Sequence, residues 1–183
     1  TRGVEVKRVR LRGTHTLAYV LMRFMRDVTG LRGTELHYFG LRIPRSLRSL
    51  WIYIETVSVL PLVFLYYYLL RIRYLIISER SLLDVIIWIL TGVNETPSKL
   101  LSVKALKFLL LLAFKFKNYT IYVTASKSTL ISRKATERSL IIKMKDYYDL
   151  LANRLSLTTI DTSTCSTTEC LKRVLSIIYT IYR

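Results

Sequence analysis

The sequence contains no glutamine and has few residues that break or cross-link a chain. Its 183 residues include 2 cysteines, 3 prolines and 6 glycines. Acidic residues are also scarce, because 12 Asp and Glu stand against 29 Lys and Arg, which gives a formal net charge of +17. This imbalance favours polyanionic partners, namely nucleotides, nucleic acid or an acidic membrane surface. The lack of glutamine, together with the content of Ile, Leu, Lys and Arg, is in keeping with a thermophilic source.

Three motifs that carry chemistry in other proteins are also missing. The sequence has no glycine-rich phosphate-binding loop of the form G-x-x-x-x-G-K-[ST], no H-E-x-x-H zinc motif and no nucleophile elbow. The two cysteines, Cys165 and Cys170, are five positions apart, an offset that does not suit a metal pair on one helix face. We expect them to be reduced thiols in a cytoplasmic protein.

The positive charge is not gathered into one tract, which argues against a simple nucleic-acid-binding arm. Basic residues are spread along the chain and are densest over residues 1–48. Residues 27–50 are punctuated by glycine, and we expect them to form a basic surface excursion. This region is either a solvated loop or a flap that faces a phosphate group or another partner.

The longest apolar run covers residues 50–70 and contains one charged residue, Glu55. By length alone this run could span a bilayer. However, Glu55 and Pro61 divide it into shorter halves, and a helix that packs between a sheet and another helix is apolar nearly all round. We therefore expect a buried helix and consider a membrane the less suitable partner. A small basic membrane protein anchored by residues 50–70 stays open as an alternative.

Four short segments have the pattern of β-strands and alternate with helical patterns. Two helical segments separate each strand from the next, and one more follows the last strand. The order β-α-α-β-α-α-β-α-α-β-α predicts a layered α/β fold with a largely parallel sheet. We expect one domain over residues 1–183. The predicted strands are residues 4–9, 74–78, 119–124 and 157–160.

Charged and hydroxyl side chains follow three of these four strands. The carboxyl ends of parallel strands lie along one edge of a sheet, and open α/β sheets bind ligands at that edge. An acid there can hold a hydrated Mg²⁺, and an arginine can grip a phosphate group with two hydrogen bonds. A salt bridge at the strand end is the alternative interpretation. The residues that follow the strands are Arg10, Arg12, Glu79, Arg80, Asp161 and Thr162.

The order and spacing of these features resemble the thymidylate kinase family of P-loop nucleoside monophosphate kinases over nearly the whole chain. Residues 9–18, VRLRGTHTLA, align without gaps with the family's stretch T-R-E-P-G-G-T-P-L-A, where a loop helps to hold the nucleotide substrate. Arg10, Gly13, Leu17 and Ala18 match, whereas Leu11 replaces the acid and Arg12 replaces the proline.

Residues 78–81, SERS, stand where the family has an Asp-Arg-Tyr/His element at the end of its third strand. Glu79 keeps the acid and Arg80 keeps the phosphate-gripping arginine, whereas Ser81 departs from the aromatic residue. The acid in this element would hold the hydrated Mg²⁺.

Two later stretches complete the resemblance. Residues 119–123, followed by Leu130 and Arg133, are similar to the fourth strand and to the A-L-x-R helix start that leads into the family's lid. Residues 160–162 resemble the fifth strand and the loop near the base of ATP. By this resemblance, residues 133–140 would form a short lid.

The resemblance implies transfer of the ATP γ-phosphoryl group to a nucleoside monophosphate, with Mg²⁺ as cofactor. Such catalysis depends on positioning and charge stabilisation. The catalytic residues would be Glu79, Arg80, Arg133 and Arg138, with Glu79 also as the metal ligand. The residues that bind substrate would be Arg10, Arg12, Gly13, Lys134, Asp161 and Thr162.

The family's first strand, phosphate-binding loop and first helix have no counterpart in this chain. The resemblance therefore implies a fragment with a three-layer P-loop NTPase-like fold, inactive by itself. In the family's sheet the missing strand lies between the third and the fourth, so we expect a gap or abnormal closure between the strands at 74–78 and 119–124. The alternative is a non-catalytic relative that binds nucleotides, or nucleic acid through residues 1–48. A homodimer is also left open.

Overall fold

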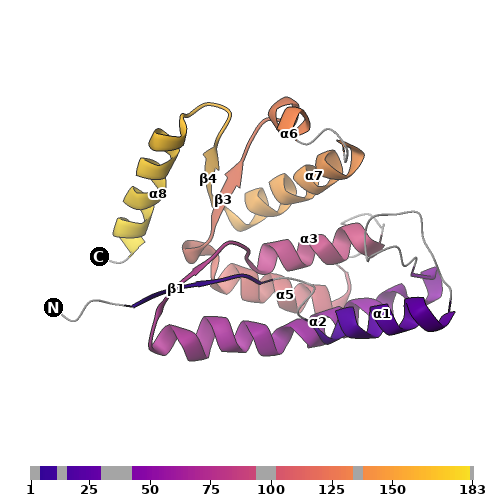
Figure 1. The fold of residues 1–183 in the computed structure, drawn as a ribbon. Coiled ribbons are helices and arrows are strands. Elements are labelled where there is room, and N and C mark those ends of the chain that lie inside the picture. Colours follow the sequence, from indigo (N-terminus) through magenta and orange to yellow (C-terminus); the bar gives the residue numbers. More distant parts are fainter. Residues whose placement is uncertain (1–4, 12–15, 30–42, 94–101, 134–137, 182–183) are drawn as a thin grey trace. The chain divides into compact units, whose positions relative to one another are not determined.

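A computed structural model describes residues 5–11, 16–29, 43–93, 102–133 and 138–181. Within these residues the strands and α-helices follow in the predicted order, β-α-α-β-α-α-β-α-α-β-α (Figure 1). The fold is mixed α/β, and all strand pairing is parallel. The chain divides into two compact units, Thr1–Leu111 and Leu112–Arg183. The expectation of one domain over residues 1–183 stays a prediction.

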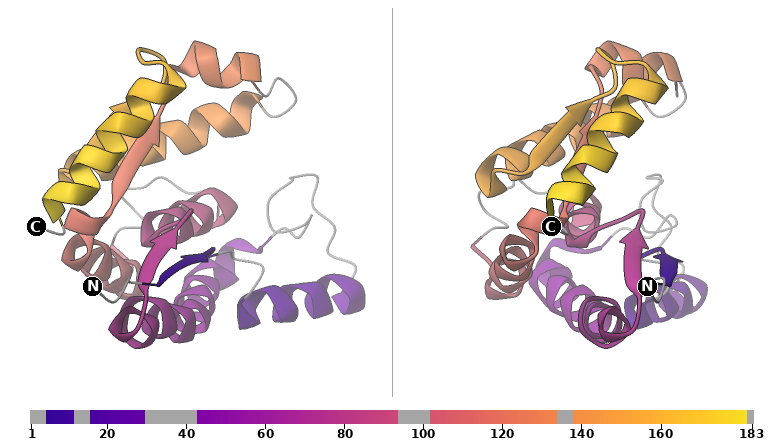
Figure 2. Two further views of the ribbon diagram at one scale, coloured as in Figure 1. Left: turned by 60° about the vertical axis from the view of Figure 1, so that its left-hand side comes forward. Right: turned by 90° about the vertical axis from the view of Figure 1, so that its left-hand side faces the viewer.

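Unit 1 contains one pair of parallel strands and most of the apolar helices. The strands are β1 (Val6–Val9) and β2 (Leu75–Ser78), and they lie side by side in both views of Figure 2. Their register places Val6 opposite Leu75 and Val9 opposite Ser78. The helices are α1 (Leu17–Thr29), α2 (Arg48–Phe64), α3 (Leu82–Val93) and α5 (Lys104–Lys115), and the boundary between the units falls within α5.

The core of unit 1 is centred on α3, which is apolar nearly all round and buried along most of its length. Its first turn is fixed by Ser81, whose backbone N–H donates to Asp84 Oδ2 at 2.7 Å and whose Oγ accepts from the Leu83 N–H at 3.1 Å. These contacts satisfy N–H groups that have no partner inside the helix. The most deeply buried α3 residues are Leu82, Ile86, Ile87, Ile89 and Leu90.

The apolar run at residues 50–70 forms one continuous helical segment rather than two halves. A 3₁₀ turn (Arg45–Leu47) leads into α2, and α2 runs through Pro61 into a π-helical turn (Leu65–Leu69) and a last 3₁₀ turn (Leu70–Ile72). The expectation that Pro61 divides the run is therefore wrong. Proline removes a single backbone donor, and the helix tolerates that loss at an exposed position.

Most of the described parts of residues 27–50 are helical rather than loop. Residues 27–29 close α1, and a 3₁₀ turn begins at Arg45. Residues 30–42 lie outside the described residues, so the predicted surface excursion stays a prediction for that stretch. Helix α1 packs on α2 through Met22 and Trp51, which share a small cluster with Ile43.

Strand β2 is less buried than its apolar sequence predicts. Ile77 is 49% exposed, and Ser78 is exposed as well. A short, continuous apolar run of this kind is typical of a strand that is covered on both faces. Within the described residues β2 pairs with β1 alone, so one edge of the strand is not covered by another strand.

Unit 2 holds the second parallel pair, β3 (Ile121–Thr124) and β4 (Thr158–Asp161), with Ile121 opposite Thr158 and Thr124 opposite Asp161. Leu151 and Ile160 are buried in its core. The helices are α6 (Lys127–Arg133), α7 (Arg138–Leu155) and α8 (Thr167–Ile181).

Side-chain caps stand at the starts of α6 and α8. Ser126 Oγ accepts from the Thr129 N–H at 3.2 Å. Ser166 and Glu169 form a reciprocal capping box, because the Ser166 N–H donates to Glu169 Oε2 at 2.8 Å and the Glu169 N–H donates to Ser166 Oγ at 3.3 Å.

Helix α7 ends in a left-handed turn. Ser156 has φ 52°, and its N–H donates to Asn153 O at 3.1 Å. The next N–H, that of Leu157, donates to Ala152 O at 3.0 Å. This pair of hydrogen bonds is the Schellman arrangement, which satisfies the last carbonyl groups of a helix and turns the chain into β4.

The four strands form two sheets, β1–β2 and β3–β4, rather than one. Strands β2 and β3 belong to different units, so the expected gap or abnormal closure between them stays a prediction. The parallel pairing and the element order are thus as predicted, whereas a P-loop NTPase fold stays a prediction.

Candidate functional site

The carboxyl ends of β1 and β2 bring together three of the predicted site residues. Because Val9 lies opposite Ser78, the next residues, Arg10 and Glu79, are adjacent at the strand ends. The Glu79 backbone N–H donates to Val9 O at 3.4 Å, which extends the pairing by one residue. Arg80 follows directly at the exposed surface.

The Glu79 carboxylate is held by two arginines of the neighbouring strand. Its Oε2 accepts hydrogen bonds from Arg10 Nε and pairs with Arg10 Nη2, while its Oε1 pairs with Arg8 Nη2. The salt bridge anticipated as the alternative interpretation is therefore present, but its partners come from β1 rather than from Arg80. Arg8 was not among the predicted residues, although its position two residues before Arg10 places both on one face of a strand.

The predicted magnesium role of Glu79 does not fit this arrangement. Both carboxylate oxygens already accept from guanidinium groups, so a hydrated cation would have to displace Arg8 and Arg10. The geometry instead suits an anion, because Arg8 and Arg10 converge on one carboxylate and Arg80 follows it directly in the chain.

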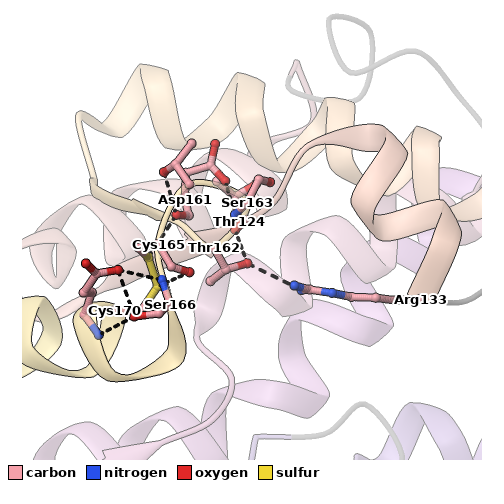
Figure 3. The surroundings of a disulfide bond; sticks show 10 residues. Thr124, Arg133, Asp161, Thr162, Ser163, Cys165, Ser166 and Cys170 are labelled. Carbon is pink, nitrogen blue, oxygen red and sulfur yellow. Dashed lines mark hydrogen bonds between the residues drawn. A yellow bond between two sulfur atoms is a disulfide. The ribbon is translucent and has the colours of Figure 1, made fainter.

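A second strand-end cluster lies in unit 2, at the carboxyl ends of β3 and β4 (Figure 3). Thr162 is fixed to Thr124 by two hydrogen bonds, since its backbone N–H and its Oγ1 both donate to Thr124 O, at 2.8 and 2.9 Å. Arg133 reaches from the end of α6 and donates through Nη1 to Thr162 Oγ1 at 3.5 Å. The sequence therefore selected two residues, Arg133 and Thr162, that lie in contact.

Asp161 stands at the exposed end of β4 and organises the turn that follows. The Ser163 backbone N–H donates to Asp161 Oδ1 at 2.8 Å. This hydrogen bond is the main cause that holds the pKa of Asp161 below its usual value, with further lowering by the Ser163 hydroxyl and by the positive charge of Lys145. Ser163 Oγ accepts from the Ser126 N–H at 2.6 Å, so the turn is tied to the start of α6.

A polar network beside this cluster was missed by the sequence analysis. Lys145 Nζ donates to both carboxylate oxygens of Asp149 at 2.9 Å and to Thr124 Oγ1 at 3.0 Å. Tyr122 OH donates to Asp149 Oδ1 at 2.9 Å. Burial is the main cause that raises the pKa of Tyr122 to about 12, and the Asp149 charge adds to it. Lys145 and Asp149 are four residues apart on a helix face that is otherwise apolar, and that spacing was the available signal.

The two cysteines form a disulfide bond, which corrects the prediction of reduced thiols. Cys165 lies in the turn before α8 and Cys170 in the first turns of the helix, with a Cα–Cα distance of 5.8 Å (Figure 3). The prediction considered an offset of five along one helix. Because Cys165 is outside the helix, the chain brings the two sulfur atoms together.

Four predicted site residues are not described in full. Arg12, Gly13 and Lys134 lie outside the described residues, as do residues 134–137 of the predicted lid. Arg138 begins α7, but its side chain is not described. The sequence predicted that the carboxyl ends of all four strands lie along one sheet edge. The structure has two such edges, one at β1–β2 in unit 1 and one at β3–β4 in unit 2.

No family model, curated protein or solved structure matches this chain. The resemblance to the thymidylate kinases therefore depends on the motifs and their order alone.

Proposed function

We propose that this chain is a thymidylate-kinase-like domain that binds the phosphate group of a nucleoside monophosphate, as part of a protein that transfers the γ-phosphoryl group of ATP. The observation that carries the proposal is the position of Arg10 and Arg80 at one strand-end rim, beside Glu79. The parallel pairing and the element order, both predicted before, support it.

The charge at this rim suits a phosphate dianion. Three arginines and one carboxylate leave a net charge of +2, and the Arg80 guanidinium has no partner among the described residues. Guanidinium groups bind phosphate with two parallel charge-assisted hydrogen bonds, which makes arginine the preferred residue for such contacts. Arg80 would bind the acceptor phosphate, and Arg10 would lie at the acceptor nucleotide.

In the same proposal, Arg133, Lys134 and Arg138 would close over the transferring group, and Asp161 and Thr162 would lie near the base of ATP. The contact between Arg133 and Thr162 supports a shared location for these two. The sequence holds no phosphate-binding loop, so the phosphate groups of ATP and the Mg²⁺ ion would be held by residues that this chain does not supply. We accordingly propose binding, without transfer, for the chain by itself.

Calorimetric titration with thymidine monophosphate tests the binding. Arg80→Gln should weaken it by about tenfold or more, because a hydrogen bond to a charged group contributes about 1.5–3 kcal/mol. Arg154→Gln is the matched control, since Arg154 is an exposed arginine on α7. Equal affinities for the two variants would contradict the assignment of Arg80.

The transfer step is tested separately with ATP, Mg²⁺ and a panel of nucleoside monophosphates. The 183-residue chain should show no turnover. Turnover by this chain alone would refute the need for a phosphate-binding loop.

A second candidate is a non-catalytic relative that binds polyanions. The engagement of both Glu79 oxygens by arginine favours it, because that carboxylate is not free for Mg²⁺. Binding that shows no nucleotide preference and weakens steeply with added salt would support this candidate over the first.

A further inference from the structure

The helical segment Arg45–Ile72 leaves one apolar face uncovered. Of the described residues it alone is long and apolar enough to cross a membrane by length and composition, and only 39% of its most apolar stretch is buried. Val57 is 62% exposed and Phe64 is 56% exposed. We define the α2 apolar face as the exposed residues Leu50, Tyr53, Val57, Phe64, Leu65, Tyr68, Leu69 and Ile72.

From Leu50 to Val57 these residues are three or four positions apart, and after the exposed Pro61 the row resumes as the pairs Phe64/Tyr68 and Leu65/Leu69, each four positions apart, so they follow one side of the helix. The opposite side is buried in unit 1, where Trp51, Ile52 and Val59 are at most 4% exposed. The sequence predicted that the helix at residues 50–70 is apolar because it is buried on both sides. In the structure only one side of the helix is buried. An exposed apolar row of this length indicates an interaction surface.

Positive charge stands at both ends of the α2 apolar face. Arg45 and Arg48 lie at its start, and Arg71 and Arg73 lie at its end. The sole acid between them, Glu55, is 4% exposed and belongs to the buried side. The surface thus combines apolar side chains with flanking cations and exposes no acid.

We propose that the α2 apolar face docks on an anionic lipid surface, with the helix lying parallel to the membrane plane. The apolar side chains would enter the boundary between head groups and acyl chains, and the exposed Arg45 and Arg73 would contact lipid phosphate groups. A spanning orientation is disfavoured because the other side of the helix packs in unit 1.

A second copy of the chain fits this face less well. In an antiparallel pair of identical helices, Arg45 and Arg48 would meet Arg71 and Arg73 of the other copy. In a parallel pair, each arginine cluster would meet itself. Neither arrangement supplies an exposed acid from this segment, so like charges would repel in both.

Sedimentation with phosphatidylcholine vesicles, with and without phosphatidylglycerol, tests the proposal on the full chain. The protein should bind the vesicles that contain phosphatidylglycerol and not those of phosphatidylcholine alone. Val57→Ser/Phe64→Ser should weaken this binding by about tenfold or more, because two apolar side chains no longer enter the membrane. Leu171→Ser is the matched control, since Leu171 is 56% exposed on α8.

Arg45→Gln/Arg73→Gln should weaken binding by about tenfold or more, since each cation near the surface contributes about a fivefold effect. Circular dichroism checks that each variant is folded. The proposal is overturned if the folded wild-type chain does not bind anionic vesicles. It is also overturned if Val57→Ser/Phe64→Ser binds them as the wild type does, which would indicate charge attraction alone. Loss of a dimer in that variant, without change in vesicle binding, would assign the face to a second copy.

Discussion

At the residue scale, Glu79 is the side chain on which the two interpretations of the first strand-end rim differ. The kinase resemblance assigns it to Mg²⁺, whereas the structure pairs it with Arg8 and Arg10. Arg10, Glu79 and Arg80 could be selected from the sequence because each directly follows a strand. The pairing of the Glu79 carboxylate with arginine could not be predicted from the sequence, because it depends on the register between two strands, and Arg10 and Glu79 are 69 residues apart.

Replacement of the paired carboxylate should therefore strengthen anion binding. In Glu79→Gln the net charge of the rim rises from +2 to +3, and Arg8 and Arg10 lose a competing anion. We expect inorganic phosphate to bind about fivefold tighter in the absence of Mg²⁺, because a surface ion pair is worth about 1 kcal/mol. Isothermal titration measures the change.

Asp146→Asn is the control for that experiment, since it removes an acid paired with Lys127 in unit 2. Weaker phosphate binding by Glu79→Gln would contradict the prediction. It would show that the carboxylate holds the two arginines in the geometry that binds.

A second prediction concerns the buried acid of α2. Burial is the main cause that raises the pKa of Glu55 from 4.5 to about 7, and a hydrogen bond from Trp51 opposes the rise. Because the folded-state value lies above the unfolded one, the neutral carboxyl supports folding below about pH 4.5. That support is lost as the pH rises through about 7.

The full loss amounts to about 3 kcal/mol. Glu55→Gln should therefore be more stable than the wild type at pH of about 8 and similar to it near pH of about 4. Urea denaturation across this range measures the difference. A stability gap between Glu55→Gln and the wild type that does not change with pH would contradict the assignment.

At the element scale, the sequence predicted the order of strands and helices. Hydrophobic periodicity is a local signal, so it assigns an element without knowledge of the tertiary contacts of that element. The exposure of elements was harder to predict. Ile77 of β2 and Val57 of α2 follow patterns typical of burial, yet Ile77 is 49% exposed and Val57 is 62% exposed.

The end of α7 gives a prediction at this scale. Ser156 has φ 52°, a conformation in which the Cβ of an L-residue is crowded and glycine is not. Ser156→Gly should stabilise unit 2 by about 1 kcal/mol, as expected for a helix that ends in a Schellman turn. Thermal unfolding followed by circular dichroism measures this.

Ser156→Ala is the matched control, because alanine keeps the Cβ. A loss of stability in Ser156→Gly would indicate that the greater freedom of glycine in the unfolded chain outweighs the relief of crowding.

At the scale of the whole molecule, the sequence predicted one sheet edge with the strand ends side by side, and the structure has one such edge in each unit. Sequence periodicity assigns strands, but it does not assign which strands pair. The prediction that β2 and β3 are not neighbours came from the kinase resemblance rather than from their residues. The polar network of Tyr122, Lys145 and Asp149 was hidden for a similar reason, because it joins α7 to β3 through tertiary contacts.

The net charge of +17 is a property of the molecule rather than of one site, and it gives the last prediction. Binding to single-stranded nucleic acid should weaken steeply as salt is added, because each neutralised phosphate releases counterions. Thymidine monophosphate makes few phosphate contacts, so its affinity should depend less on salt. Fluorescence titrations of both ligands over a salt series check this. Equal salt dependence would contradict a separate phosphate site at Arg80.

The link between Cys165 and Cys170 has a practical consequence for anyone who handles the protein. A sample prepared with dithiothreitol and a sample left in air are two chemical species, which differ by the mass of two hydrogen atoms. In the air-exposed species the start of α8 is tethered to the turn that follows Asp161. Intact mass spectrometry before each titration would establish which of the two is in the cuvette.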